Sequence, residues 1–195
     1  TTDVLLWADA NLAALKTDHA IERVLAYSIQ KEEQGTRSHR ATMTYTHTGT
    51  FDWRTSRYRT YARVFVPKDA SLVAVYATDQ NGNTKPIPLT AVTQEVVGMY
   101  QTFGTLFIIE PQQERSLTFV YRFPDAWYTN MLATKQYELL VPKQHGTRAH
   151  GLTLSLDFGT TITGASPAEV QEEWGNSVYT HTTDLRIDRD VAIQF

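Results

Sequence analysis

The feature that most constrains the fold of this chain is an alternation of apolar and polar residues with a period of two. It is clearest in the sequence LTLSLDF at residues 152–158. Successive side chains of an extended strand point to opposite faces of a sheet, so such a run buries one face only. The pattern returns in segments beginning near residues 21, 41, 117, 137 and 185. Roughly nine to eleven short strands, with turn signals between them, predict a mainly β protein. We expect an antiparallel β-sandwich with immunoglobulin- or fibronectin-like layers.

Two segments are predicted to be helical. Apolar residues between Val4 and Leu15 recur at helical spacing behind Thr2 or Asp3 as a cap, which predicts an N-terminal helix at about residues 2–16. Pro167 behind Ser166 predicts a short helix near residues 167–173. No repeat or low-complexity linker divides the chain, and only a weak candidate boundary lies near residues 128–132. We therefore expect one domain over residues 1–195.

Composition excludes several classes of function. The formal net charge of −3 argues against a general nucleic-acid binder, which needs a strongly basic surface. The absence of cysteine excludes disulfides, thiol catalysis and thiolate metal sites. The apolar runs are shorter than the roughly 20 residues of a membrane helix, and no signal peptide is visible at the start. We predict no nucleic-acid partner and no direct insertion of this segment into a membrane.

No complete catalytic or cofactor motif is present. The six histidines lack metal-ligand spacing, and there is no nucleophile elbow, Walker loop or dinucleotide fingerprint. Asp-Phe-Gly at residues 157–159 matches a kinase motif by chance, since the other kinase motifs are missing. We therefore expect no catalytic residue, no metal and no cofactor.

Calcium remains a less favoured alternative at two places. The sequence from Asp79 to Asn83 resembles the start of a calcium loop, but its glycine falls one place early and Asn-Gly is a strong hairpin signal. Three aspartates at residues 184, 188 and 190 surround two arginines. Alternating charges of this kind are more typical of a solvated strand with cross-strand ion pairs.

Aromatic and arginine side chains are densest at residues 50–67, and they supply the candidate binding residues. A guanidinium can stack on an aromatic ring or pair with a carboxylate. The stretch is therefore interpreted either as a buried structural ladder, which we favour, or as a surface that grips sugar rings or an anionic polymer. Together with three aromatic residues elsewhere, the candidates are Trp53, Arg54, Arg57, Tyr58, Arg59, Trp127, Tyr128 and Trp174.

Three segments resemble a known family. They are residues 9–23 with Asp-Ala-Asn-Leu and Lys-Thr-Asp, residues 51–67 with Phe-Asp-Trp-Arg and Tyr-Arg-Thr-Tyr-Ala-Arg-Val-Phe-Val-Pro, and residues 117–121. Together they resemble the C-terminal portion of the bacterial family catalogued as domain of unknown function 4012, over most of this chain. The resemblance implies an extracytoplasmic module of a large envelope protein that is anchored by a membrane segment outside this chain. The family supplies no functional residues to transfer.

These observations lead to three hypotheses. The first is a non-catalytic, extracytoplasmic module of a bacterial cell-surface protein, used for display, spacing or adhesion. The second is recognition of a carbohydrate or cell-wall polymer through the exposed candidates, because aromatic rings stack on sugar faces. The third is an envelope glycan hydrolase, which would need two carboxylates roughly 5–9.5 Å apart across a cleft. A glycan, a cell-wall polymer or another surface protein is the expected partner.

Overall fold

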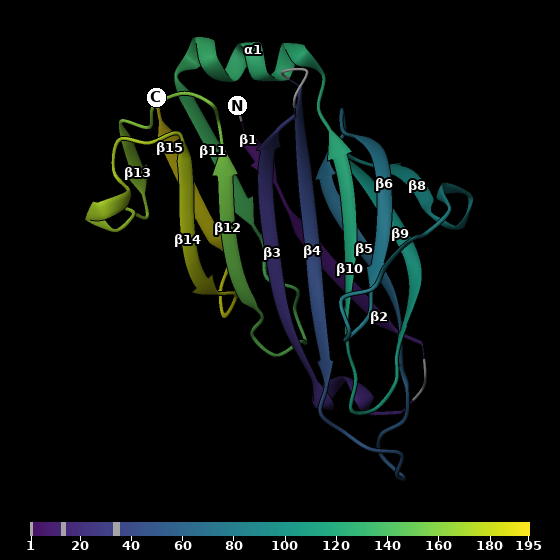
Figure 1. The fold of residues 1–195 in the computed structure, drawn as a ribbon. Helices are drawn as coiled ribbons and strands as arrows, with labels where there is room; N and C mark the ends of the chain where they lie inside the picture. Colours follow the sequence, from purple (N-terminus) through teal and green to yellow (C-terminus); the bar gives the residue numbers. More distant parts are fainter. Residues whose placement is uncertain (1, 13–14, 33–35) are drawn as a thin grey trace.

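The computed structural model describes residues 2–12, 15–32 and 36–195, and within these ranges the protein is mainly β (Figure 1). The large sheet contains, in spatial order, β14 (Val178–Asp184), β12 (Gly151–Asp157), β3 (Ile21–Lys31), β4 (Arg37–His47), β10 (Glu114–Arg122), β6 (Ser71–Thr78) and β7 (Thr84–Pro86). The β5 sheet contains β2 (Leu6–Asn11), β5 (Tyr58–Pro67), β9 (Tyr100–Ile109) and β8 (Thr93–Val97). The β11 sheet contains β1 (Thr2–Val4), β11 (Gln136–Val141), β15 (Arg189–Gln194) and β13 (Gly164–Ser166).

Helical structure is confined to short segments. The α-helix α1 (Asp125–Thr134) connects β10 with β11 and lies across one end of the sheets (Figure 1). It follows Pro124, and it ends where Lys135 adopts a left-handed conformation with a φ of 52°. Single 3-10 turns lie at Thr17–Ala20, Leu89–Ala91 and Gln171–Glu173.

The two smaller sheets lie behind the large sheet, and the core fills the space between them (Figure 1). Trp7 of β2 contacts Phe119 of β10 with ring centroids 5.5 Å apart. The ring centroids of Tyr45 in β4 and Phe107 in β9 are 5.8 Å apart. Buried residues of all three sheets form one continuous cluster, as expected when one apolar face of each sheet is removed from water.

The predicted β class is confirmed, and the residues that alternate along a strand are alternately buried and exposed, as expected. Every second residue from Ile21 to Ile29 is buried in β3. The expectation of purely antiparallel layers is corrected, because β12 pairs with β3 and β1 pairs with β11 in parallel. In β5 only one side is fully buried: Ala62, Val64 and Val66 face the core, whereas Arg63 is exposed.

The predicted N-terminal helix is wrong. Residues 2–11 form β1 and β2, which are separated by Leu5 and contribute to different sheets. Their inward residues follow a period of two, namely Asp3, Leu5, Trp7 and Asp9. Two of these four are aspartates, so the strand pattern is invisible to a search for apolar residues. Both aspartates bind side chains of strands that are distant in the sequence: Asp3 binds Tyr27 and Tyr137, and Asp9 binds Arg23.

The predicted helix near residues 167–173 is also corrected. A single 3-10 turn occupies Gln171–Glu173, and residues 167–170 are not helical. Pro167 therefore does not begin a helix, and the Ser166–Pro167 peptide bond is cis.

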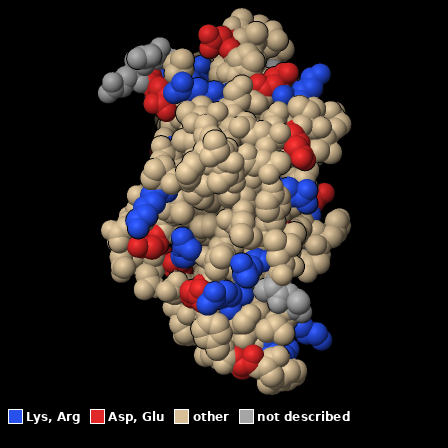
Figure 2. All heavy atoms as spheres, turned by 90° about the vertical axis from the view of Figure 1, so that its right-hand side faces the viewer, with Lys and Arg blue, Asp and Glu red and all other residues tan. Residues whose placement is uncertain are grey.

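One face of the protein has an uncharged area. Figure 2 views the right-hand side of Figure 1, and the upper middle of this face is mostly uncharged, with charged side chains along its margins and across its lower part. The edge strand β8 lies on this side, and it pairs only with β9 among the described residues (Figure 1). Val96 and Met99 in this hairpin are 64% and 69% exposed. An apolar, unpaired strand edge is a surface that other chains can contact.

Candidate functional site

The aromatic-arginine stretch divides into an exposed loop and a buried strand. Trp53 is 84% exposed, and the guanidinium of Arg54 lies 5.5 Å from its ring centroid. Arg57 and Arg59 are exposed as well, whereas Tyr58 is fully buried at the start of β5. The favoured interpretation of a buried ladder therefore does not hold for the indole of Trp53.

The loop that presents Trp53 is held by one carboxylate. Asp52 accepts hydrogen bonds from the backbone N–H groups of Arg54 and Thr55, both at 2.7 Å. These bonds lower the pKa of Asp52, the Arg54 bond most strongly. The indole next to Asp52 is thus displayed on an ordered turn.

The other candidate aromatic residues lie in different surroundings. Trp127 is half-buried and stacks on Phe123 with centroids 4.6 Å apart. Tyr128 is 6% exposed, and its hydroxyl lies 2.7 Å from Nε2 of His39. Trp174, by contrast, is 64% exposed. The loop after β4 that carries Trp53 and the segment beside β13 that carries Trp174 lie at opposite ends of the protein (Figure 1). The predicted residues therefore do not form one surface.

Trp174 borders a pocket of about 390 Å³. The pocket is lined by β13 and the segment that leads to β14, including Ile162, Ala165, Glu169 and Trp174. The indole nitrogen of Trp174 donates a 3.0 Å hydrogen bond to the backbone oxygen of Glu169, which fixes the ring. The Glu169 carboxylate accepts from the backbone N–H of Thr180 at 2.7 Å. A fixed, exposed ring beside a carboxylate can stack on an apolar ring face and accept a hydroxyl hydrogen bond.

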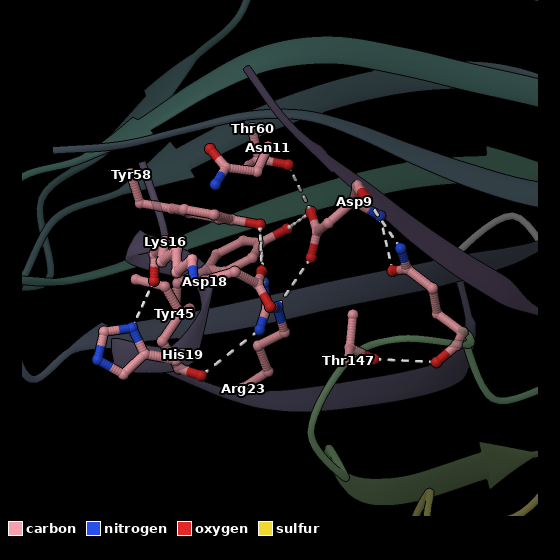
Figure 3. A network of polar contacts seen from close by, with 12 residues as sticks. Asp9, Asn11, Lys16, Asp18, His19, Arg23, Tyr45, Tyr58, Thr60 and Thr147 are labelled. Carbon is pink, nitrogen blue, oxygen red and sulfur yellow. Dashed lines mark hydrogen bonds and ion pairs between the residues drawn. The ribbon is translucent and has the colours of Figure 1, made fainter. Parts of the chain in front are cut away.

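The most extensive polar network is centred on Arg23 and is almost wholly internal (Figure 3). The guanidinium Nε donates to Asp9 Oδ2 at 2.9 Å. The NH2 group of Arg23 donates to Asp18 at 2.5 Å and to the Tyr58 hydroxyl at 2.7 Å. The second oxygen of Asp9 accepts from the hydroxyls of Tyr45 at 2.7 Å and Thr60 at 2.9 Å. Groups from three segments of the chain therefore bind one buried cation.

The electrostatics of this network favour its charged form. Burial alone would lower the pKa of Arg23, but the neighbouring charges, Asp9 first, raise it above the ordinary value. Burial also raises the pKa of Tyr45 and of Tyr58, so both phenols stay protonated as donors. Gln144 extends the network by bonding the backbone N–H and C=O of Asp9, each at 2.8 Å (Figure 3).

A second buried polar cluster joins the β11 sheet to the large sheet. Asp3 Oδ2 accepts hydrogen bonds from Tyr27 at 2.5 Å and Tyr137 at 2.8 Å. His39 Nδ1 lies 2.6 Å from the Tyr27 hydroxyl, and its Nε2 faces Tyr128. Burial raises the pKa of Asp3 to about 6, although the tyrosine hydrogen bonds oppose the rise. Burial likewise lowers the pKa of His39 to about 3, so its imidazole is neutral.

Two of the carboxylates considered for calcium, Asp79 and Asp184, are engaged by other groups of the protein. Asp79 accepts hydrogen bonds from the backbone of Asn81 and Asn83, as a turn residue does. Asp184 pairs with Arg186 at 3.0 Å and Arg189 at 2.7 Å. Over residues 2–12, 15–32 and 36–195, no group of three histidines or acidic residues could hold a metal ion.

The sequence predicts neither buried cluster as a unit. It gives Asp9 and His39 no role and Asp3 only that of a helix cap, although Arg23 carries a signal. It occupies an inward position of the alternation between Ile21 and Leu25. An arginine at a core position requires an acidic partner inside the fold, because an unpaired buried charge is very costly. Its partner Asp9 could not be identified, since it lay in the segment predicted to be helical.

Comparisons with known proteins support the fold alone. No protein-family profile and no curated protein matches this chain. Among solved structures, a candidate nutrient-binding protein of Legionella pneumophila aligns with a TM-score of 0.54 at 8% identity, over 98% of this chain and 71% of its own. A candidate protease of Parabacteroides distasonis has a TM-score of 0.46 at 12% identity, over 91% of this chain and 41% of its own. An M1 zinc metallopeptidase of Deinococcus radiodurans has a TM-score of 0.26 at 11% identity, over 100% of this chain and 41% of its own. The Legionella protein thus shares the fold of this chain.

Proposed function

We propose that this chain is a non-catalytic, extracytoplasmic module of a bacterial cell-surface protein that serves display, spacing or adhesion. The resemblance to the domain-of-unknown-function family 4012 supports this location. Within the described ranges, no helix is long and apolar enough to cross a membrane. The resemblance implies that a membrane anchor belongs to a segment outside this chain.

The observation that carries the proposal is that the charged side chains of the largest polar network are bound to one another. Asp9 and Arg23 are almost fully buried, and together with the partly exposed Asp18 they bind one another and two tyrosines, so these charged groups have partners within the protein. A catalytic acid or base needs access to a substrate proton within hydrogen-bond reach. The exposed features are instead an indole on a fixed turn, an apolar strand edge and the pocket beside Trp174, all of which suit contact with other molecules.

Separate measurements of binding and turnover test this role. The purified protein is incubated with isolated bacterial cell walls, and both the bound protein and the released soluble sugars are quantified. We expect retention on the walls without sugar release. Sugar release that is lost in Glu169→Gln would establish the hydrolase alternative, while protein that does not bind the walls would contradict adhesion.

A second candidate function is recognition of a carbohydrate or cell-wall polymer at the Trp174 pocket. The observation in its favour is the fixed and exposed indole beside a cavity of about 390 Å³, a size within the usual range for ligand sites. The Legionella protein of the same fold is described as a candidate nutrient-binding protein, which agrees with a binding role.

Trp53 offers a matched control for this second function, because it is an exposed tryptophan outside the pocket. On a glycan array, we expect binding that is lost in Trp174→Ala and kept in Trp53→Ala. An empty array, or equal loss in the two variants, would exclude the pocket as the glycan site.

A further inference from the structure

A second pocket, of about 360 Å³, opens between the start of β3 and the segment that leads into β12. Its lining comes from residues 21–24 and 148–150. Arg23, the centre of the buried network, forms part of this wall. The pocket therefore lies next to the internal polar network.

His150 lines the pocket with an unsatisfied ring. The residue is 3% exposed, and Nε2 is buried without a hydrogen-bond partner among the described residues. Buried polar atoms almost always have a partner, so an orphaned nitrogen at a pocket wall indicates a place for one. Burial first, then the charges of Arg23 and Lys143, lower the pKa of His150 to about 4. The ring is thus neutral near pH 7 and carries one N–H donor.

The basic groups around the pocket have spare capacity. Arg23 has five N–H donors, and its partners are Asp9, Asp18, Tyr58 and the backbone oxygen of Ile21. Arg148 is exposed and forms no ion pair with any described residue.

Lys143 is close enough to affect His150, and its ammonium group donates only to backbone oxygens, those of Gln144 and Thr147. Its positive charge therefore has no carboxylate partner in the described part of the chain. Glu22 is the acidic residue of the pocket wall, while Asp9 and Asp18 already hold Arg23. Glu22 forms no ion pair with a described residue, so it is the one acidic side chain of the wall that does not already hold Arg23.

We propose that this pocket binds an oxyanion, the carboxylate or phosphate group of a small molecule or of a polymer. Arg148 pairs with the anion at the rim, the His150 ring donates to it inside, and Arg23 supplies its remaining N–H. An arginine fork matches the geometry of carboxylates and phosphates, and charge-assisted hydrogen bonds are the strong ones. This inference is independent of the proposed surface role, because an enzyme or a transport protein could carry the same site.

Titration of the intact protein by NMR tests the site. Inorganic phosphate and acetate are the two probes, and sodium chloride at matched ionic strength is the blank. We expect one or both probes to shift the backbone amide signals of residues 21–24 and 148–150. A phosphate response identifies a phosphate group as the natural ligand chemistry, and an acetate response identifies a carboxylate.

Two arginine variants separate a specific site from general charge attraction. Arg148→Gln removes the rim cation at an exposed position, and Arg63→Gln removes an exposed cation on the outer face of the β5 sheet. We expect the apparent dissociation constant to rise at least tenfold in Arg148→Gln and to stay unchanged in Arg63→Gln. The proposal is overturned if neither probe shifts these signals at up to ~50 mM, well above a millimolar dissociation constant. Equal weakening in the two variants would overturn it as well.

Discussion

The guanidinium Nε of Arg23 lies 2.9 Å from the carboxylate of Asp9, and both side chains are 1% exposed. Arg23 belongs to β3 of the large sheet and Asp9 to β2 of the β5 sheet. The ion pair therefore links the large sheet to the β5 sheet within a core that otherwise consists mainly of apolar side chains. Such a pair costs much desolvation free energy, and its net contribution depends on complete hydrogen bonding. Here the hydroxyls of Tyr45 and Thr60 donate to Asp9, and the hydroxyl of Tyr58 accepts from Arg23 (Figure 3).

Removal of the cation should destabilise the protein strongly. In Arg23→Met, Asp9 keeps a buried negative charge without its partner, and we expect the free energy of unfolding to fall by about 3–5 kcal/mol. Urea denaturation measures the change. The control is Arg63→Met, an exposed arginine for which a change within ~0.5 kcal/mol is expected. Adding Asp9→Asn to Arg23→Met should recover part of the loss, and a simple sum of the two single effects would contradict the pairing.

The two tryptophans Trp7 and Trp53 should respond oppositely to truncation. Trp7 is 2% exposed and its indole nitrogen donates to Tyr45 at 2.9 Å, so Trp7→Ala should cost about 3–5 kcal/mol. Trp53 is 84% exposed, and Trp53→Ala should change stability by no more than ~0.5 kcal/mol. Thermal denaturation of both variants checks this. A large loss in Trp53→Ala would mean that the loop packs against the core.

Stability should fall as the pH is lowered from 7 to 5, and Asp3 should soften the fall. The pKa of His39 is lowered from 6.5 to about 3 in the folded protein. Its contribution is present above pH 6.5 and is lost as the pH falls towards 3, because the unfolded chain takes up the proton first. Asp3 acts in the opposite direction, since its pKa is raised from 3.8 to about 6. Its contribution is present below pH 3.8 and is lost as the pH rises through 6.

Asp3→Asn isolates the second effect. We expect this variant to lose about 1 kcal/mol more than the parent protein between pH 7 and pH 5, because the compensating protonation of Asp3 is gone. Urea denaturation at the two pH values gives the difference directly. The comparison is made within each protein, so any constant cost of the substitution cancels. Equal pH dependence in the two proteins would show that Asp3 does not titrate in this window.

Gly104 allows two side chains to cover the outer face of the β5 sheet. A Cβ at this position would lie 2.8 Å from Cγ of Arg63 and 3.0 Å from the ring of Tyr61. Gly104→Ala should therefore cost roughly 1–3 kcal/mol, as overpacking does. Arg63→Ala in the same chain should relieve part of this strain, which denaturation of the double variant measures. A neutral Gly104→Ala would mean that Arg63 and Tyr61 move away without cost.

The alternation of side chains predicted the strands of the large sheet because it depends on the chain geometry alone. Any extended segment with apolar residues at every second place, such as residues 152–158, has one face to bury. The first eleven residues show the limit of this reasoning. Asp3 and Asp9 sit at inward positions, so the visible apolar residues matched a helix better than a strand. Only their tyrosine and arginine partners make a carboxylate acceptable inside the core.

The sequence could predict which aromatic residues are candidates for binding, but not which of them are exposed. The sequence identified Trp53, Tyr58 and Trp174 as notable aromatic residues. Their exposure was decided by the fold, which buries Tyr58 beside Arg23, exposes Trp53 on a turn and sets Trp174 beside a pocket. The sequence could not single out His150, because what marks it is a buried ring nitrogen without a hydrogen-bond partner among the described residues.

Local geometry and the order of apolar residues are properties of neighbours along the chain, so the sequence by itself determined that this protein forms sheets with one buried face each. The pairing of Asp9 with Arg23, of Asp3 with Tyr137, and of β12 with β3 joins residues far apart in the sequence. Those choices were made only by the tertiary structure, because the free energy of a buried charge depends on which groups surround it after folding.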